Sequence, residues 1–217
     1  LARGDFQLKL YQAGIHFYLM GILLLSLGIA LSITSTLGTS PFDALLVGLY
    51  RTFGLTIGSW EFIVGFMFIL VNLIIIKRPE FFALITSFLT GAGIDFWLFI
   101  LNNWFIPTSW FSQWICLLLY LILTGIGTSI YLQSKIAPNP MDRTMVIITN
   151  KTGMSITYSR TIINIVLVLV AFAFNGAIGI GTVVITLFTG YFIKLFLPLA
   201  ENMKKRTLTN HQEQHVS

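Results

Sequence analysis

Six long apolar runs constrain this chain of 217 residues more than any other feature of its sequence. An apolar helix of about 20 residues spans the hydrocarbon core of a bilayer, which is about 30 Å thick. The runs cover residues 14–36, 59–76, 81–101, 110–132, 155–174 and 178–197. Only 10% of the residues are charged, too few to cover a water-soluble domain of this size. The sequence therefore predicts an all-α membrane protein with six transmembrane helices in contact with the lipid bilayer.

Two further segments, 41–53 and 140–152, have a helical pattern but are too short to cross a membrane. A helix of that length is about 20 Å long, well short of the hydrocarbon core. We expect each segment to form either a re-entrant helix that enters and leaves on one side, or a helix lying in the interface.

Both short segments begin with a related tetrapeptide, Ser40-Pro41-Phe42-Asp43 in one and Asn139-Pro140-Met141-Asp142 in the other. Ser and Asn are favoured N-cap residues, and proline is favoured at the first helical position because it has no N–H to satisfy. The pattern therefore predicts two helix starts. On a second hypothesis, the same Pro and Asp residues line a path through the membrane.

The chain is an internal duplication. A constant shift of 99 residues, without gaps, superimposes residues that punctuate structure: Gly28 on Gly127, Pro41 on Pro140, Asp43 on Asp142, Gly54 on Gly153, Thr90 on Thr189 and Gly91 on Gly190. We expect two units, 14–101 and 110–200, each with three spans and one short helix. A cytoplasmic N-terminal segment (1–13), an external connector (102–109) and a cytoplasmic polar tail (201–217) complete the predicted organisation.

The distribution of basic residues predicts the orientation. Basic residues of membrane proteins concentrate in cytoplasmic loops, and Lys77-Arg78 and Lys204-Lys205-Arg206 follow the second and sixth spans. Both termini are then expected inside the cell. Three spans in each unit is an odd number, so the two units are predicted to be inserted in opposite senses. Inverted repeats of this kind, with short or broken helices, are common in secondary transporters.

Four ionisable residues lie within the predicted spans or at their edges: Glu61, Asp95, Arg160 and Lys194. Ionisable residues at membrane depth are costly and tend to mark pathways. With Pro41, Asp43, Pro140 and Asp142 they form the candidate substrate path. Because Glu61 and Arg160 are expected near opposite sides of the membrane, we predict local partners: Arg51 for Glu61, and Asp142 for Arg160.

Several functional classes have no support in the sequence. The single cysteine, Cys116, excludes an internal disulfide and a cysteine-based metal cluster. No catalytic constellation, nucleotide-binding loop or metal-ligand cluster is present, so we expect no enzyme activity, no cofactor and no metal. The formal charge of +5 is explained by the orientation of the chain, and we expect no nucleic-acid partner.

The residues 37–43 and 90–95, with the repeated Pro-x-Asp at 140, resemble the YczE/YyaS/YitT family of bacterial integral membrane proteins. The resemblance covers about residues 14–198. It implies a location in the bacterial cytoplasmic membrane, and it implies no catalytic residues.

Two functions are compatible with these features. The first is a transporter or channel-like facilitator of an unknown small solute or ion, which the inverted duplication favours. The alternative is a membrane-embedded accessory or regulatory protein that binds a protein partner at the cytoplasmic face through residues 135–152 and the basic tail. A polar cavity that joins the two Pro-x-Asp turns would favour transport.

Overall fold

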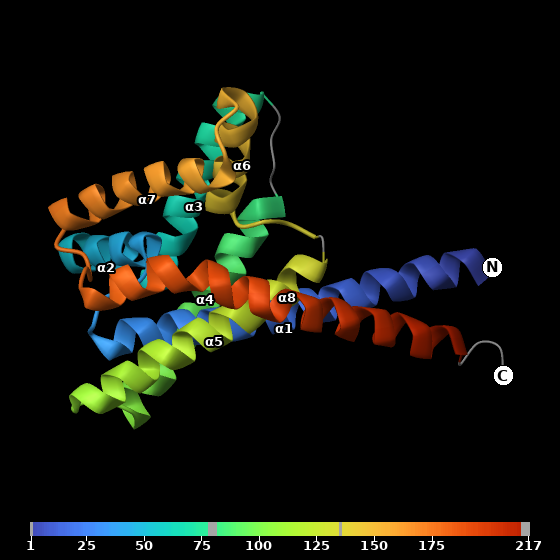
Figure 1. Cartoon of the computed structure of the whole chain (residues 1–217), viewed down its shortest axis with the longest axis horizontal. Coiled ribbons are helices and arrows are strands. Elements are labelled where there is room, and N and C mark those ends of the chain that lie inside the picture. The colour runs from blue at the N-terminus through green and yellow to red at the C-terminus, as the bar shows by residue number, and fades with distance from the viewer. Residues whose placement is uncertain (1, 78–81, 135, 214–217) are drawn as a thin grey trace.

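A computed structural model describes residues 2–77, 82–134 and 136–213, and this part of the chain is all-helical. Its eight helices are α1 (Ala2–Ser35), α2 (Pro41–Phe53), α3 (Ile57–Ile76), α4 (Phe82–Trp104), α5 (Trp110–Ser134), α6 (Pro140–Thr152), α7 (Ile156–Ala173) and α8 (Ile180–Glu213). Figure 1 shows α1, α5 and α8 lying alongside one another, with α3 and α6 extending together to one side.

The six predicted spans are confirmed as helices. In the described part of the chain, α3, α4, α5, α7, residues 14–35 of α1 and residues 180–205 of α8 are long and apolar enough to cross a membrane. The short helices α2 and α6 have the predicted bounds. Three residues named in the sequence predictions, Arg78, Phe81 and Lys135, lie outside the described residues, as do the ends of the two predicted terminal segments, residue 1 and residues 214–217.

Helices α1 and α8 are longer than their apolar runs. Helix α1 begins at Ala2, and α8 continues to Glu213. Hydropathy identifies only the part of a helix that is apolar enough for lipid. It does not locate the end of the helix, which can continue into polar sequence. Lys204 Nζ donates to the Gln133 carbonyl at 2.6 Å and so joins the extension of α8 to the end of α5.

Helices α1 and α5 pack closely through glycines. A Cβ atom added at Gly28 would lie 2.6 Å from Thr124 Oγ1, and one added at Gly127 would lie 2.6 Å from the backbone nitrogen of Leu25. The 99-residue shift relates Gly28 to Gly127 and Leu25 to Thr124. The same glycine contact therefore occurs twice, once from each unit to the other. Small residues allow membrane helices to approach this closely.

The outer helices follow the same pairing. Helix α4 packs on α1 as α8 packs on α5, and α6 packs on α3 as α2 packs on α7. At the first pair, a Cβ atom on Gly93 would meet the Ser26 side chain, and at the second, one on Gly125 would meet Phe192. The 99-residue shift relates Gly93 to Phe192 and Ser26 to Gly125. The same contact therefore occurs in both units, with the glycine on α4 in the first and on α5 in the second.

One contact differs between the halves of the chain. Helices α3 and α4 pack through Gly58 and Gly91, each of which would place a Cβ atom against the other's carbonyl oxygen. Gly190 lies 99 residues after Gly91, and a Cβ atom there would have no atom within 4 Å. Helices α7 and α8 therefore do not reproduce the close contact of α3 with α4.

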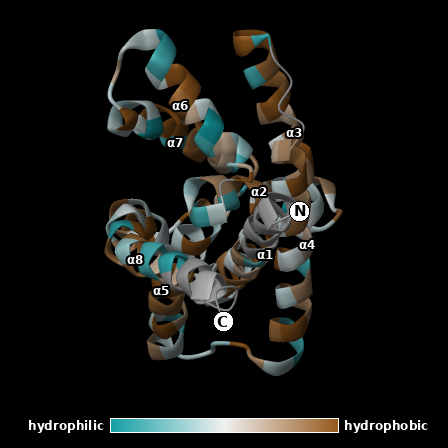
Figure 2. Ribbon diagram, turned by 90° about the vertical axis from the view of Figure 1, so that its right-hand side faces the viewer, coloured by the Kyte–Doolittle hydropathy of each residue, from teal (hydrophilic) through white to brown (hydrophobic). Residues whose placement is uncertain are grey.

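The outer faces of the helices are apolar. Exposed large side chains occur along α3, α4, α7 and α8, including Ile74, Phe99, Phe172 and Leu187. Figure 2 shows hydrophobic residues (brown) along α3 and α4. Such extensive apolar surface is unfavourable in water and suits contact with lipid chains.

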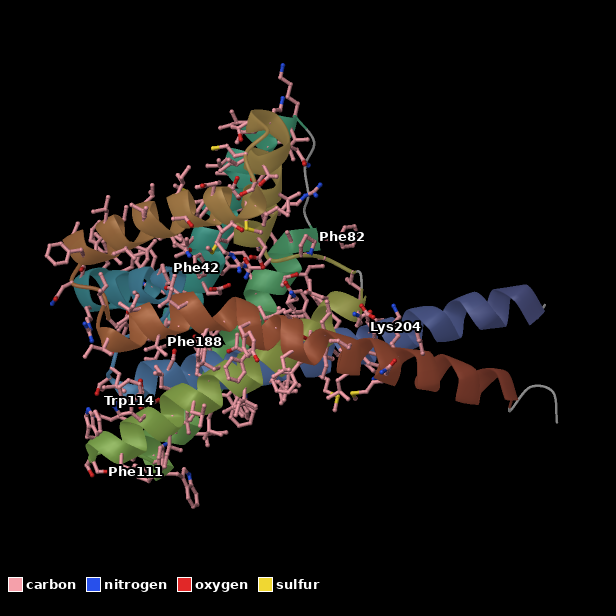
Figure 3. All side chains as sticks on the ribbon, in the orientation of Figure 1. Phe42, Phe82, Phe111, Trp114, Phe188 and Lys204 are labelled. Carbon is pink, nitrogen blue, oxygen red and sulfur yellow. The ribbon has the colours of Figure 1, made fainter. Side chains whose placement is uncertain are left out.

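Aromatic and basic side chains lie at opposite ends of the α5 and α8 pair. Figure 3 shows Phe111 and Trp114 near the start of α5, and Lys204 toward the end of α8. The Trp110 and Trp114 rings form an edge-to-face contact with centroids 5.6 Å apart. Aromatic belts and basic residues are both typical of membrane interfaces.

Candidate functional site

Each of the two short helices begins with a side-chain N-cap followed by a proline. Ser40 Oγ accepts a hydrogen bond from the Asp43 backbone N–H at 3.2 Å, and Asn139 Oδ1 accepts one from the Met141 N–H at 3.0 Å. A proline occupies the first turn of each helix. The N-cap roles predicted for Ser40 and Asn139 are confirmed, since each satisfies an amide that has no partner within the helix.

Both helix starts open into one cavity of about 530 Å³. The turn before α2 and its first residues contribute Ser40, Pro41, Phe42 and Asp43; the turn before α6 and α6 itself contribute Pro138, Asn139, Met141, Asp142, Arg143, Met145 and Val146. The remaining lining residues come from the other six helices: Leu25, Ile29, Glu61, Thr90, Tyr120, Thr124, Thr128, Tyr131, Leu132, Arg160, Asn164, Ile185, Thr186, Thr189, Gly190 and Ile193. The cavity therefore joins the two Pro-x-Asp turns.

Five residues of the predicted substrate path line this cavity: Pro41, Asp43, Glu61, Asp142 and Arg160. Glu61 and Arg160 are each the fifth residue of their helices, α3 and α7. Because both helices begin close to the cavity, these two side chains face the same space. The prediction that the two residues lie toward opposite sides of the membrane remains untested, and the structure adds that one cavity reaches both of them.

Three residues of the predicted path lie outside the cavity lining. Asp95 Oδ1 accepts a hydrogen bond from the Gly58 N–H at 2.8 Å, so Asp95 stabilises the start of α3. Lys194 is exposed on α8. Pro140 is buried, and its carbonyl accepts a hydrogen bond from Thr144 Oγ1 at 2.9 Å.

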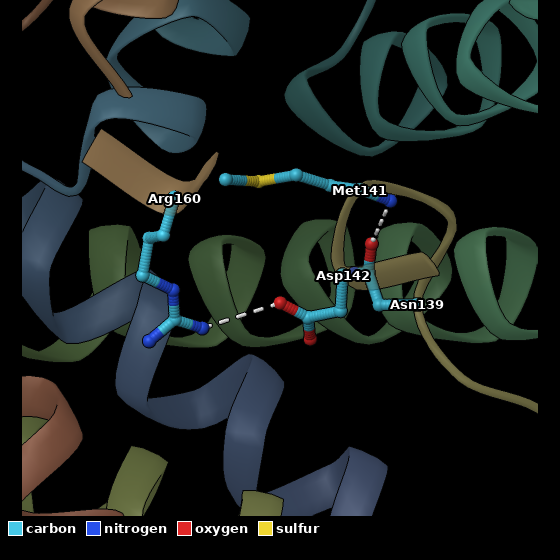
Figure 4. Close-up of polar contacts among 4 residues, drawn as sticks. All are labelled: Asn139, Met141, Asp142 and Arg160. Carbon is cyan, nitrogen blue, oxygen red and sulfur yellow. Dashed lines mark hydrogen bonds and ion pairs between the residues drawn. The ribbon is translucent and has the colours of Figure 1, made fainter. Parts of the chain in front are cut away.

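At the second turn, Asp142 forms an ion pair with Arg160. Arg160 Nη2 lies 3.3 Å from Asp142 Oδ1, as Figure 4 shows. The predicted partner of Arg160 is therefore confirmed. The two side chains remain 41% and 37% exposed, so water screens much of their attraction and the pair adds little to folding stability. The pair places one positive and one negative group in the cavity lining.

At the first turn, two acidic side chains are buried together. Ser40 Oγ lies 2.6 Å from Asp43 Oδ2 and donates a hydrogen bond to it. Asp43 is 3% exposed and Glu61 is 1% exposed. Both side chains line the cavity. A buried carboxylate is costly unless it is paired or hydrogen-bonded, so this pair needs a positive charge or a proton.

The predicted pairing of Glu61 with Arg51 is wrong. Arg51 Nη1 donates to the Asn175 carbonyl at 2.9 Å, because the last turn of α2 packs against the loop between α7 and α8. Glu61 is buried and lines the cavity instead.

Polar residues that the sequence predictions did not select also line the cavity. Tyr120, Thr124 and Thr128 are four residues apart on α5, so they share one helix face. This spacing of polar side chains within an apolar run is a signal that could have identified them. Thr90 Oγ1 on α4 is buried without a hydrogen-bond partner among the described residues. No cluster of three His, Cys, Asp or Glu side chains suited to a metal occurs in the described part of the chain.

Comparison with known proteins identifies a family and several relatives. Residues 13–198 match DUF6198, a family of unknown function. Two proteins of Bacillus subtilis are similar: the uncharacterised protein YyaS is 45% identical over 85% of this chain and 92% of its own length, and the uncharacterised membrane protein YczE is 32% identical over 84% of each. An uncharacterised protein of Haemophilus influenzae is 28% identical over 84% of this chain and 83% of its own length.

No solved structure matches the chain. The predicted resemblance to the YczE and YyaS proteins is confirmed. With six apolar helices and these relatives, the chain is a multi-pass integral membrane protein.

Proposed function

Because the chain belongs to DUF6198, a family of unknown function, we propose a function from its geometry: it is a transporter or channel-like facilitator of a small solute or ion. The observation that carries the proposal is the single cavity lined by both Pro-x-Asp turns. Its volume of about 530 Å³ lies within the range of small-molecule sites. The lining combines apolar side chains with a few charged ones, as in a site that binds and releases a solute.

The proposed architecture is a pair of inverted repeats. The reciprocal contacts of Gly28 and Gly127 support a two-fold relation between the units, because in such a relation each contact occurs twice with its partners exchanged. Each unit has three apolar spans. An odd number of crossings then requires that the units are inserted in opposite senses.

In this arrangement α2 and α6 are re-entrant helices. Each is 13 residues long, and each has its first residues at the cavity that the two units share. The N-terminal amides of a helix carry a partial positive charge, and transporters place such helix ends beside bound solutes. Movement of one unit against the other would expose the cavity first to one side of the membrane and then to the other.

We place the protein in the bacterial cytoplasmic membrane with both termini inside. The basic residues near the end of α8 and the aromatic cluster at the start of α5 support this orientation. We further propose that solutes enter and leave between α7 and α8, which lack the close glycine contact of α3 with α4 beside Gly190 in the cavity lining.

The alternative function, an accessory protein that acts through a cytoplasmic partner, requires no internal cavity. The observed cavity therefore supports transport over this alternative. The exposed end of α6 remains available for a partner in either case.

The proposal is tested with neighbouring residues of α7. Asn164 lines the cavity, whereas Ile165 is 54% exposed on the apolar outer face. In a Cys116→Ser background, Asn164→Cys should react with a small, charged thiol reagent added to membrane vesicles, and Ile165→Cys should not, because lipid covers it. Solutes that raise the melting temperature of the purified protein are then assayed for uptake into proteoliposomes.

Asn164→Trp should abolish that uptake by filling the cavity, and Ile165→Trp, the matched control, should retain it. Two results would contradict the proposal: equal reactivity at both cysteines, or stabilising solutes that are never taken up. The second result would favour an accessory role in which the cavity only binds a ligand.

A further inference from the structure

The charges that line the cavity do not balance. The lining contains three carboxylates, from Asp43, Glu61 and Asp142, and two guanidinium groups, from Arg143 and Arg160. With all five ionised, one negative charge is left over. Arg160 is paired with Asp142 at the second turn. Asp43 and Glu61, at the first turn, form no ion pair with any described residue.

The two acids at the first turn differ in their hydrogen bonds. Asp43 accepts a hydrogen bond from the Ser40 hydroxyl and lies at the positive end of α2. Glu61 receives no hydrogen bond from any described residue, although it is 99% buried. A buried carboxylate in this condition is stable only with a proton or a nearby cation.

Three hydroxyl groups that line the same cavity are buried without a hydrogen-bond partner among the described residues: those of Thr90, Thr124 and Tyr131. Of these, Thr90 is on α4, which packs on α3, the helix that carries Glu61. Thr90 is 1% exposed and lines the cavity, and its Oγ1 has no hydrogen-bond partner among the described residues. Its repeat equivalent, Thr189, donates to the Ile185 carbonyl at 2.6 Å, as threonines in helices commonly do. The Thr90 hydroxyl is thus an additional buried oxygen that a ligand could use.

The repeat itself indicates which ligand fits. Asp43 and Glu61 correspond, by the 99-residue shift, to Asp142 and Arg160. In the second unit, the position of Glu61 holds a guanidinium group, which is a covalently attached cation. The first unit has the same two positions and no such cation.

We propose that Asp43, Glu61 and Thr90 bind one monovalent cation from solution, either an alkali cation such as Na⁺ or a proton. Carboxylate and hydroxyl oxygens are suitable ligands for such hard cations. Binding of this cation does not depend on the proposed transport function. If the protein is a transporter, the same cation is the ion whose movement is coupled to that of the solute.

The polar and charged groups that share the cavity with Glu61 include Asp43 from α2, Thr90 from α4, Tyr120 and Tyr131 from α5, Asp142 and Arg143 from α6, and Arg160 from α7. Helix α3 also packs on α4 near Asp95, which is hydrogen-bonded to Gly58. The test must therefore isolate Glu61 from these neighbours.

The test is thermal unfolding of the purified protein in detergent, with NaCl exchanged for choline chloride at constant ionic strength and about pH 8. A ligand that binds only the folded state raises its melting temperature in proportion to the logarithm of ligand concentration. If the site binds Na⁺, we expect NaCl to raise the melting temperature by several degrees. If the site binds a proton, we expect the same rise in choline chloride when the pH is lowered to about 5.

Glu61→Gln, which keeps the shape of the side chain, should abolish either response. In choline chloride at about pH 8 its melting temperature should equal or exceed that of the wild type, because a buried charge has been removed. Glu201→Gln, the same change at an exposed residue of α8, should leave the response intact.

A response that survives in Glu61→Gln, or a wild type that responds to neither Na⁺ nor pH, would refute the cation site. Because binding is measured without a membrane gradient, the two proposals can fail separately. A cation response without solute uptake would refute transport alone. Uptake without a cation response would refute only the cation site.

Discussion

Arg160 Nη2 lies 3.3 Å from Asp142 Oδ1, and the equivalent pair in the first half of the chain is Glu61 with Asp43. The same two positions therefore hold an acid–base pair in one unit and an acid–acid pair in the other. Positive-inside selection explains a basic residue at one copy. It does not explain why both pairs line a single cavity, which makes the difference relevant to what the cavity binds.

The Arg160–Asp142 pair should influence solute binding more than folding. Because both side chains are more than one third exposed, Arg160→Gln should lower the free energy of unfolding by about 1 kcal/mol or less. The same change adds one uncompensated negative charge to the cavity, so it should alter the affinity for any charged solute. Thermal unfolding and solute-binding titrations on the same preparation measure the two effects. A large loss of stability with unchanged binding would contradict this assignment.

Glycine-to-alanine changes at equivalent positions should have opposite effects. A Cβ atom at Gly91 would meet the carbonyl of Gly58, which is backbone and cannot move away cheaply, so Gly91→Ala should destabilise the protein by about 1–3 kcal/mol. Gly190 has no atom within 4 Å of an added Cβ, and alanine is the better helix former by about 1 kcal/mol. Gly190→Ala should therefore be neutral or stabilising. The measurement is the melting temperature of each variant in detergent. An equal decrease for Gly91→Ala and Gly190→Ala would mean that α7 and α8 pack as closely as α3 and α4.

Much of the local structure could be predicted from the sequence. The bounds of α2 and α6 follow from their caps, because a serine or asparagine before a proline starts a helix and a glycine at 54 or 153 ends it with a positive φ. Hydropathy identified the six long helices. These features depend on neighbours in the sequence, so local rules determine them.

The composition of the cavity could not be predicted in the same way. Arg51 bonds to Asn175, 124 positions away, because of how α2 packs on α7. Thr90 and Tyr120 become lining residues only once α4 and α5 are placed around the two turns. A spacing within one helix indicates which side chains share a face, as it does for Tyr120, but only tertiary packing determines which other helices that face meets.

The two roles of the first turn can be separated by mutation. Ser40→Ala removes the acceptor of the Asp43 N–H and should lower the free energy of unfolding by about 1 kcal/mol. Asp43→Asn keeps a side chain that can accept the Ser40 hydrogen bond, so it should cost about 1 kcal/mol or less while abolishing the response to solutes. Unfolding and ligand-induced stabilisation are measured for both. If Asp43→Asn loses stability and response in proportion, the aspartate acts only as part of the helix cap.

The orientation of the chain can be tested by labelling single cysteines in intact cells. With Cys116 replaced by serine, cysteines are introduced at Asn103, in the last turn of α4, and at Lys151, in the last turn of α6; both positions are exposed. The inverted arrangement places Asn103 outside and Lys151 inside. A membrane-impermeant maleimide should therefore label Asn103→Cys in intact cells and label Lys151→Cys only after permeabilisation, with total labelling in detergent as the control for reactivity. If Lys151→Cys reacts from outside, α6 lies on the external side, the units share one orientation, and the inverted-repeat support for transport is lost.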